Sequence, residues 1–75
     1  PRNYRRSDDR IKEDINDRLT DSHYLDASDI EVEVNDSEVI LTGTVCSRYA
    51  KRLAEDIAED VSGVTHLENR ISVNQ

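Results

Sequence analysis

Apolar residues recur along the chain with two different spacings, and each spacing predicts a kind of secondary structure. In the first third of the chain they are four residues apart, at Ile11, Ile15 and Leu19. This spacing is typical of a helix with one narrow apolar face. Ser7 is suited to cap such a helix, and the acidic residues in the first turn of the helix interact favourably with the helix dipole. We expect a helix that begins after Ser7 and ends soon after Leu19, with a surface ion pair between Asp14 and Arg18.

The spacing changes to two in the middle of the chain, which predicts two strands. Residues 30–34 alternate between apolar and acidic side chains, and residues 38–45 form a second apolar run. Residues 35–37 separate the two runs and have the Asn, Asp and Ser that turns favour, so we expect a hairpin. Gly43 falls on the inner face of the second strand, where a glycine permits a bend or the close approach of another backbone.

A second helix is expected after Ser47, which is suited to cap it. Apolar residues occupy every position of one helical face, namely Ala50, Leu53, Ala54, Ile57, Ala58 and Val61. We expect Gly63 to follow its C-cap as the C′ residue, and a last strand to run from Leu67 to Val73. Because a strand–helix–strand unit crosses over with the right hand, we predict an α+β fold of order αββαβ. Both helices then cover one face of a three-stranded mixed sheet.

Composition favours one folded domain with an unusual charge distribution. Ile, Leu and Val make up 18 of the 75 residues, which is enough for a small core. The net charge is −7, yet the first ten residues carry +2 and the other 65 carry −9. We interpret residues 1–6 as a basic arm or linker remnant and residues 7–75 as a single domain. A start at Pro1 suggests a domain excised or processed from a longer protein.

Several classes of protein do not fit the sequence. The acidic balance disfavours nucleic-acid binding, and there is no apolar run long enough for a transmembrane segment or a signal peptide. No nucleophile elbow or glycine-rich phosphate loop is present, so we expect no enzyme activity and no cofactor. His23 and His66 are not at metal-ligand spacing with each other or with Cys46, so we expect no metal site. We expect Cys46 to be buried as a small apolar residue. We also expect Tyr24 and Leu25 to fold back onto the core.

Motifs spread along the chain resemble those of a known family. The matching motifs are Ile30-x-Val32-x-Val34, Leu41-Thr42-Gly43-Thr44-Val45, Ser62-Gly63-Val64 and Asn69-Arg70-Ile71-x-Val73. Together they resemble the BON domain, named for bacterial osmotically inducible and nodulation proteins, over residues 8–74. The positions that match as structural residues of the family are Gly43, Gly63, Val64 and Asn69. Ser37 stands where the family commonly has the glycine of the hairpin, so Asp36 must supply much of the turn preference, or the turn is longer.

The resemblance implies a binding module rather than an enzyme. BON domains are thought to associate with phospholipid surfaces, often as tandem pairs in envelope proteins linked to osmotic stress. The expected partners are therefore an anionic phospholipid surface, a second BON domain or another protein. The resemblance favours the periplasm or cell envelope, while the sequence leaves the cytoplasm open.

A basic cluster in the second helix is the candidate site for lipid headgroups. The residues that we expect to contribute are Arg48, Lys51 and Arg52, with Tyr49 at the membrane interface and Arg5 and Arg6 from the arm. The three helical cations oppose the helix dipole, so the alternative interpretation is structural. In that interpretation Lys51 pairs with Glu55 and Arg52 pairs with Asp56.

Two other surfaces are either plain solvent-facing surface or candidate sites for the alternative function, association with a protein or with a second copy of the domain. One is acidic and lies toward the C-terminal end of the second helix, where carboxylates oppose the dipole: Glu55, Asp56, Glu59 and Asp60. Such a surface suits a basic partner. The other is the uncovered face of the sheet, formed by Glu31, Glu33, Ile40, Thr42 and Thr44.

Overall fold

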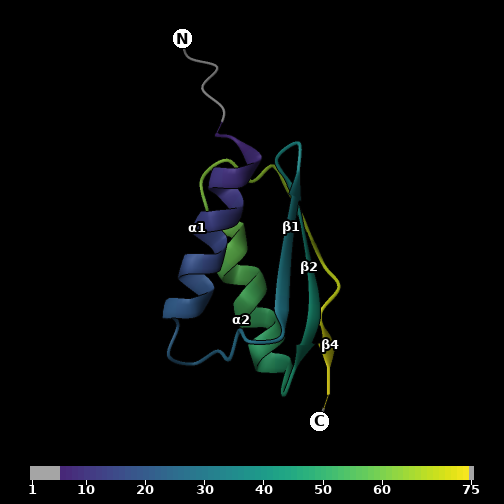
Figure 1. The fold of residues 1–75 in the computed structure, drawn as a ribbon. Coiled ribbons are helices and arrows are strands. Elements are labelled where there is room, and N and C mark those ends of the chain that lie inside the picture. The colour runs from purple at the N-terminus through teal and green to yellow at the C-terminus, as the bar shows by residue number, and fades with distance from the viewer. Residues whose placement is uncertain (1–5, 75) are drawn as a thin grey trace.

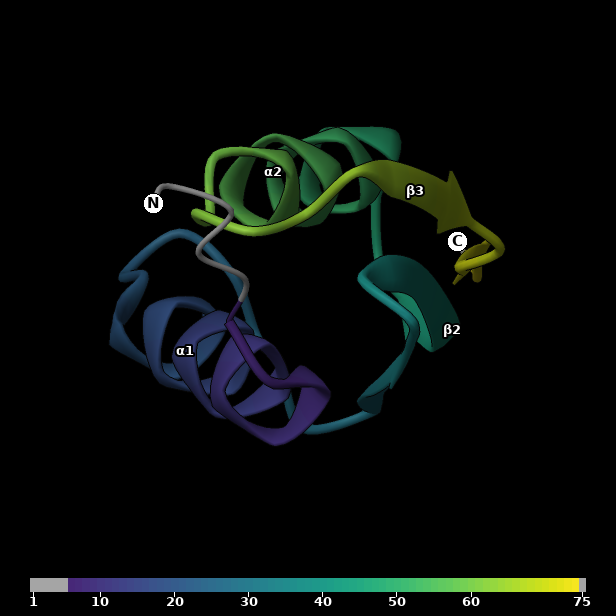
Figure 2. The same cartoon turned by 90° about the horizontal axis from the view of Figure 1, so that it is seen from above.

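Two helices lie on one side of a mixed sheet, as the α+β prediction requires (Figures 1 and 2). The structure is a computed structural model that describes residues 6–74. Its elements, in chain order, are α1 (Asp8–Asp21), β1 (Ile30–Asn35), β2 (Glu38–Val45), α2 (Arg48–Glu59), β3 (His66–Asn69) and β4 (Ser72–Val73). The αββαβ order is confirmed, with one difference in the last strand.

That difference is a break in the expected strand from Leu67 to Val73. β2 is central: it pairs antiparallel with β1 on one side and parallel with β3 and β4 on the other. The register is unchanged across the break, because Leu41 faces Asn69 and Thr44 faces Ser72. The side chain of Asn69 accounts for the break. Its Oδ1 accepts a hydrogen bond from the Ile71 backbone N–H at 3.0 Å, which turns the chain locally. The sheet therefore has four strands instead of three.

The hairpin turn is the tight two-residue kind, despite the missing glycine. Asp36 and Ser37 both have left-handed backbone angles, with φ of 53° and 68°, which is the pattern of a type I′ turn. The Asp8 carboxylate accepts hydrogen bonds from both of their backbone N–H groups, at 2.8 and 3.0 Å. The first turn of α1 thus holds the hairpin in a conformation that Ser37 would not favour alone.

The capping and periodicity predicted for α1 are confirmed. The Ser7 hydroxyl accepts a hydrogen bond from the Arg10 N–H at 3.3 Å, and Ile11, Ile15 and Leu19 are at most 1% exposed. The predicted Asp14–Arg18 pair is also present, at 3.2 Å.

The end of α2 differs from the prediction. Ser47 caps its start, accepting from the Ala50 N–H at 3.1 Å, but the helix ends at Glu59 and its C-cap is Asp60. Gly63 is therefore not the C′ residue. Val61 remains buried because a tight turn follows, in which its N–H donates to the Ala58 carbonyl at 3.2 Å. Gly63 serves this turn instead, with φ of 97°.

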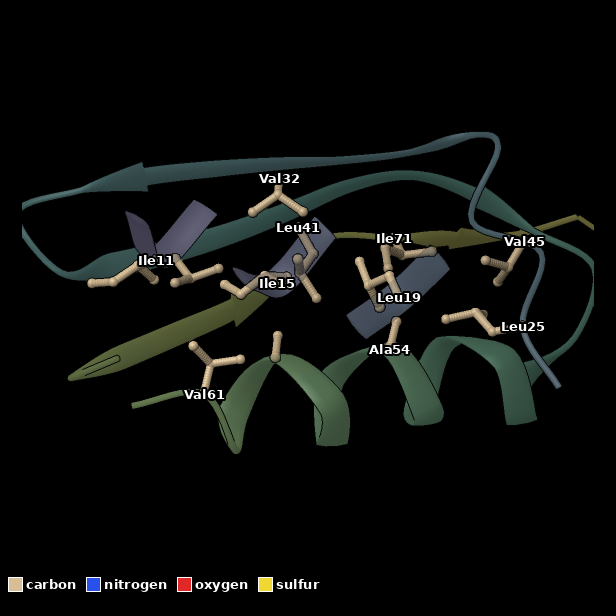
Figure 3. Close-up of a cluster of buried hydrophobic side chains, with 12 residues drawn as sticks. Ile11, Ile15, Leu19, Leu25, Val32, Leu41, Val45, Ala54, Val61 and Ile71 are labelled. Carbon is tan, nitrogen blue, oxygen red and sulfur yellow. The ribbon is translucent and has the colours of Figure 1, made fainter. Parts of the chain in front are cut away.

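Small buried residues let α2 pack close to the sheet. Ala54 and Ala58 are fully buried. Figure 3 shows side chains of α1 and β2 meeting above α2, together with Ile71, which lies between β3 and β4. The buried apolar residues are Ile11, Ile15, Leu19, Leu25, Val32, Val39, Leu41, Val45, Ala54, Ala58, Val61 and Ile71. Burial on this scale is what drives a chain of this size to fold.

Two residues expected in the core lie outside it. Leu25 is buried, but Tyr24 is 78% exposed, because neighbouring residues of this non-helical segment cannot both face inward. Cys46 is exposed as well. It follows Val45, which takes the last inward position of β2, and strand alternation turns the next side chain outward.

Candidate functional site

The basic cluster, defined as Arg48, Lys51 and Arg52, lies at the start of α2. Because only Cys46 and Ser47 connect β2 to α2, these residues lie at the end of the molecule where β2 finishes (Figure 1). Arg48 and Arg52 are exposed, and Lys51 is half-buried. Tyr49 lies among them with 64% of its surface exposed. The structure therefore brings together the four helical residues that the sequence singled out.

Tyr24 also lies at this end of the molecule, although no pattern in the sequence indicated it. A hollow of about 300 Å³ is lined by Tyr24 together with Ser47, the N-cap of α2, and Ala50 of that helix. Tyr24 and Tyr49 are the two large apolar side chains that residues 6–74 leave exposed. Tyrosine combines an apolar ring with a polar hydroxyl, so it is stable at a boundary between water and an apolar phase. We call the three cations together with these two tyrosines the basic–aromatic end.

Two acidic residues line the hollow beside the basic–aromatic end. They are Asp26 and Asp29. The Ser28 hydroxyl and N–H both donate to Asp26, at 2.6 and 3.0 Å, and these bonds hold the pKa of Asp26 below its usual range. Asp26 is therefore ionised at neutral pH. Asp29 lines the hollow with it, so two acidic side chains lie beside the start of α2.

The ion pairs expected within α2 do not form. Across the described part of the chain, no ion pair joins Lys51 to Glu55 or Arg52 to Asp56. Glu55 instead accepts a hydrogen bond from the Asn69 side-chain amide at 3.1 Å, and the same amide donates to the Lys51 carbonyl at 3.1 Å. Asn69, a position shared with the family, thus ties the last strand to α2, and the cations of the cluster stay available.

The structure does not bring Arg6 to the cluster. Its Nη1 donates to Asp14 Oδ2 at 3.0 Å and to the Ser62 carbonyl at 3.2 Å, at the far end of α2 from Arg48. Arg6 links the start of the described chain to the turn after α2. Arg5, the other arginine expected from the arm, lies outside the described residues.

Replacing Arg6 with alanine is expected to raise the pKa of Asp14 toward its ordinary value of 3.8. The Arg6 hydrogen bond is the largest cause of the lowered pKa, and Arg18 adds to it. Because the pKa of Asp14 is lowered in the folded protein, its ionised carboxylate stabilises the fold at any pH above the ordinary pKa. This stabilisation is lost as the pH falls through the lowered pKa. NMR titration of the side-chain carboxyl measures the change.

Arg10→Ala is the control for this prediction. It removes the same charge from α1, whereas Asp14 takes its hydrogen bonds from Arg6 and Arg18. An unchanged Asp14 titration in Arg6→Ala, or an equal rise in both variants, would contradict the assignment.

The uncovered face of the sheet is polar, as expected. Glu31, Glu33 and Thr44 are exposed, and Ile40 and Thr42 are half-buried. An ion pair between Arg70 and Glu68, with Nε and Oε2 2.6 Å apart, spans part of this face; it lowers the pKa of Glu68 and raises that of Arg70. The face presents charge to solvent and no apolar area of note.

Residues 6–74 contain neither a candidate metal site nor a helix that could span a membrane. No three His, Cys, Asp or Glu side chains within residues 6–74 gather as metal ligands, and His23 and His66 are both exposed. Neither α1 nor α2, the two helices of that region, has the length and hydrophobicity needed to cross a bilayer.

The fold and its exposed charged and aromatic surfaces define a small α+β domain of the binding or protein-association class. The chain belongs to the BON domain family, whose model matches residues 7–75. The resemblance seen in the sequence is thereby confirmed. Gly43, Gly63, Val64 and Asn69 all fall within the match.

One solved structure shows the same fold in a longer chain. It is the C-terminal domain of CdsD, described as the structural protein of the type III secretion system of Chlamydia trachomatis. It aligns with a TM-score of 0.72 and 17% sequence identity. The match covers 91% of this chain and 34% of that one, so the present chain spans about a third of its length. No curated protein matches the sequence.

Proposed function

We propose that the domain associates peripherally with anionic phospholipid surfaces through its basic–aromatic end. The observation that carries the proposal is the gathering of three cations and two exposed tyrosines at one end of the molecule. Phospholipid association is also what membership of the BON family favours. In this binding Arg48, Lys51 and Arg52 contact phosphates, and Tyr24 and Tyr49 enter the headgroup layer.

The charge on the rest of the domain sets the orientation and limits the strength. Each Lys or Arg near an anionic leaflet contributes roughly 1 kcal/mol, and a net charge of −7 opposes the approach. With α2 standing end-on to the surface, Glu59 lies about 16 Å farther from it than Arg48, beyond a Debye length of about 8 Å. Binding is therefore weak and sensitive to salt. A location at the cell envelope agrees with this function and with the family.

An NMR titration tests the proposal directly. Vesicles of phosphatidylglycerol are added to the domain at low and at moderate salt, with phosphatidylcholine vesicles as the comparison. We expect shifts and line broadening at Tyr24 and at residues 48–52, only with the anionic lipid and reduced by salt. An unchanged spectrum, or equal changes with both lipids, would reject the proposal.

A pair of matched variants separates the site from overall charge. Arg48→Gln/Arg52→Gln removes two positive charges from the basic–aromatic end, and Arg10→Gln/Lys12→Gln removes two from α1. We expect about a tenfold loss of vesicle binding or more for the first variant, on the basis of roughly 1 kcal/mol per charge, and a much smaller loss for the second. Equal losses would mean that net charge alone governs binding.

A further inference from the structure

The exposed face of α2 carries two charge blocks of opposite sign. Arg48 and Arg52 occupy its first half, and Asp56 and Asp60 continue the same stripe through the last helical turn and the C-cap. Residues four apart on a helix lie one above the other, so the stripe changes sign once, between Arg52 and Asp56. All four side chains are exposed.

This arrangement works against the stability of α2. Cations at the start of a helix and carboxylates at its end both oppose the helix dipole. α1 follows the favourable rule, with Asp8 and Asp9 in its first turn and Arg18 in its last. α2 has no acidic residue in its first turn and no basic residue in its last. Since the expected ion pairs within α2 are also missing, the stability of this helix does not explain the pattern.

We propose that the exposed face of α2 binds the same face of a second copy of this chain, with the two helices antiparallel. Arg52 and Asp56 are each two residues from Ala54, and Arg48 and Asp60 are each six residues from it. A twofold axis that crosses the exposed face of α2 at the level of the buried Ala54 therefore places Arg52 opposite Asp56 of the second copy and Arg48 opposite its Asp60. Each pair occurs twice, as a symmetric interface requires. A parallel arrangement would place like charges together.

The surroundings of the face fit this occupant. Tyr49 is spaced with Arg52 and Asp56 on the same side of α2, and 64% of it is exposed, so it supplies apolar area to the interface. Asp60 is held only loosely in the monomer: its carboxylate is 3.9 Å from Arg18 Nη1 and its side chain is 87% exposed. Exposed ion pairs are individually weak and screened by salt, so the dimer is weak and dissociates as salt is added.

A reciprocal charge reversal tests the interface. Variant one, Arg48→Glu/Arg52→Glu, makes the face of α2 acidic throughout, and variant two, Asp56→Lys/Asp60→Lys, makes it basic. We expect each variant alone to be monomeric. An equal mixture should form a heterodimer that has the same interface as the wild-type homodimer. Sedimentation equilibrium at low salt measures this, with self-association of each variant at least about tenfold weaker than wild type.

Folding and net charge are controlled separately. Variant one puts negative charge near the start of α2 and variant two puts positive charge near its end. Both changes interact favourably with the helix dipole, so the melting temperature of each variant should not fall. Arg10→Glu/Lys12→Glu changes the net charge as much as variant one but lies on α1, and it should dimerise like wild type. A monomeric wild type near 1 mM protein would overturn the proposal, and so would a mixture that fails to associate. No lipid is present, so this outcome is independent of the vesicle experiment.

Discussion

Replacing Gly43 with alanine is expected to destabilise the domain by about 3–5 kcal/mol, the sum of backbone strain and overpacking. Gly43 has φ of 116°, a conformation that residues with a side chain rarely adopt. A Cβ added there would lie 1.9 Å from the Asp29 carbonyl oxygen and 2.9 Å from its carbonyl carbon. The obstacle is backbone that cannot move aside, since the Thr44 N–H donates to the same carbonyl at 3.2 Å. A loss of this size is a large share of the stability of a small domain.

Gly63→Ala is the matched comparison. Gly63 also has a positive φ, of 97°, but its nearest obstacle is the end of the Ile11 side chain at 3.1 Å, which can shift. We expect a smaller loss, about 1–2 kcal/mol from backbone strain. Urea unfolding followed by circular dichroism measures both variants. If Gly43→Ala unfolds at the same urea concentration as Gly63→Ala, then the close approach to Asp29 does not stabilise the fold.

Replacing Asp8 with alanine is expected to cost about 2–3 kcal/mol, because it removes two charge-assisted hydrogen bonds at once. Both bonds go to the backbone of the hairpin turn, where Asp36 and Ser37 have left-handed angles. Without the carboxylate, the N–H of Ser37, a residue only 3% exposed, loses this acceptor. We expect the melting temperature to fall and the amide resonances of the turn to broaden.

Asp9→Ala controls for the helix dipole. Asp9 is also acidic and in the first turn of α1, but it is exposed. Its loss should cost less than about 1 kcal/mol, the usual value of one charge near a helix end. Equal destabilisation by the two variants would show that the dipole, and not the link to the hairpin, is what Asp8 provides.

Local patterns predicted most of the fold because they act over a few residues. The four-residue spacing of Ile11, Ile15 and Leu19 needs only one partner surface, and the alternation in β1 needs only one buried face. The end of α2 could not be predicted in the same way. Val61 fits the helical pattern but is buried by a turn, and hydrophobic spacing cannot distinguish the two.

The remaining features depend on contacts between distant residues. Asn69 breaks the last strand while its side chain also binds α2, and no local pattern shows that α2 is within reach. The candidate site divides similarly. Arg48 and Arg52 are neighbours by helical spacing alone, whereas the position of Arg6 is set by a bond to Ser62, 56 residues away. Tyr24 lies in a segment with no periodicity, so its exposure had no signal in the sequence.

The central place of β2 has a consequence for the order of folding. As the chain is synthesised, α1 and the hairpin can form before residues 66–73 have emerged. Until then one edge of β2 has unpaired backbone groups beside Val39, Leu41 and Val45, three side chains that are buried only in the finished domain. Unpaired strand edges with apolar side chains are sites of aggregation. The nascent domain is thus most vulnerable just before its final strands arrive, and the crossover through α2 is the step that ends this exposure.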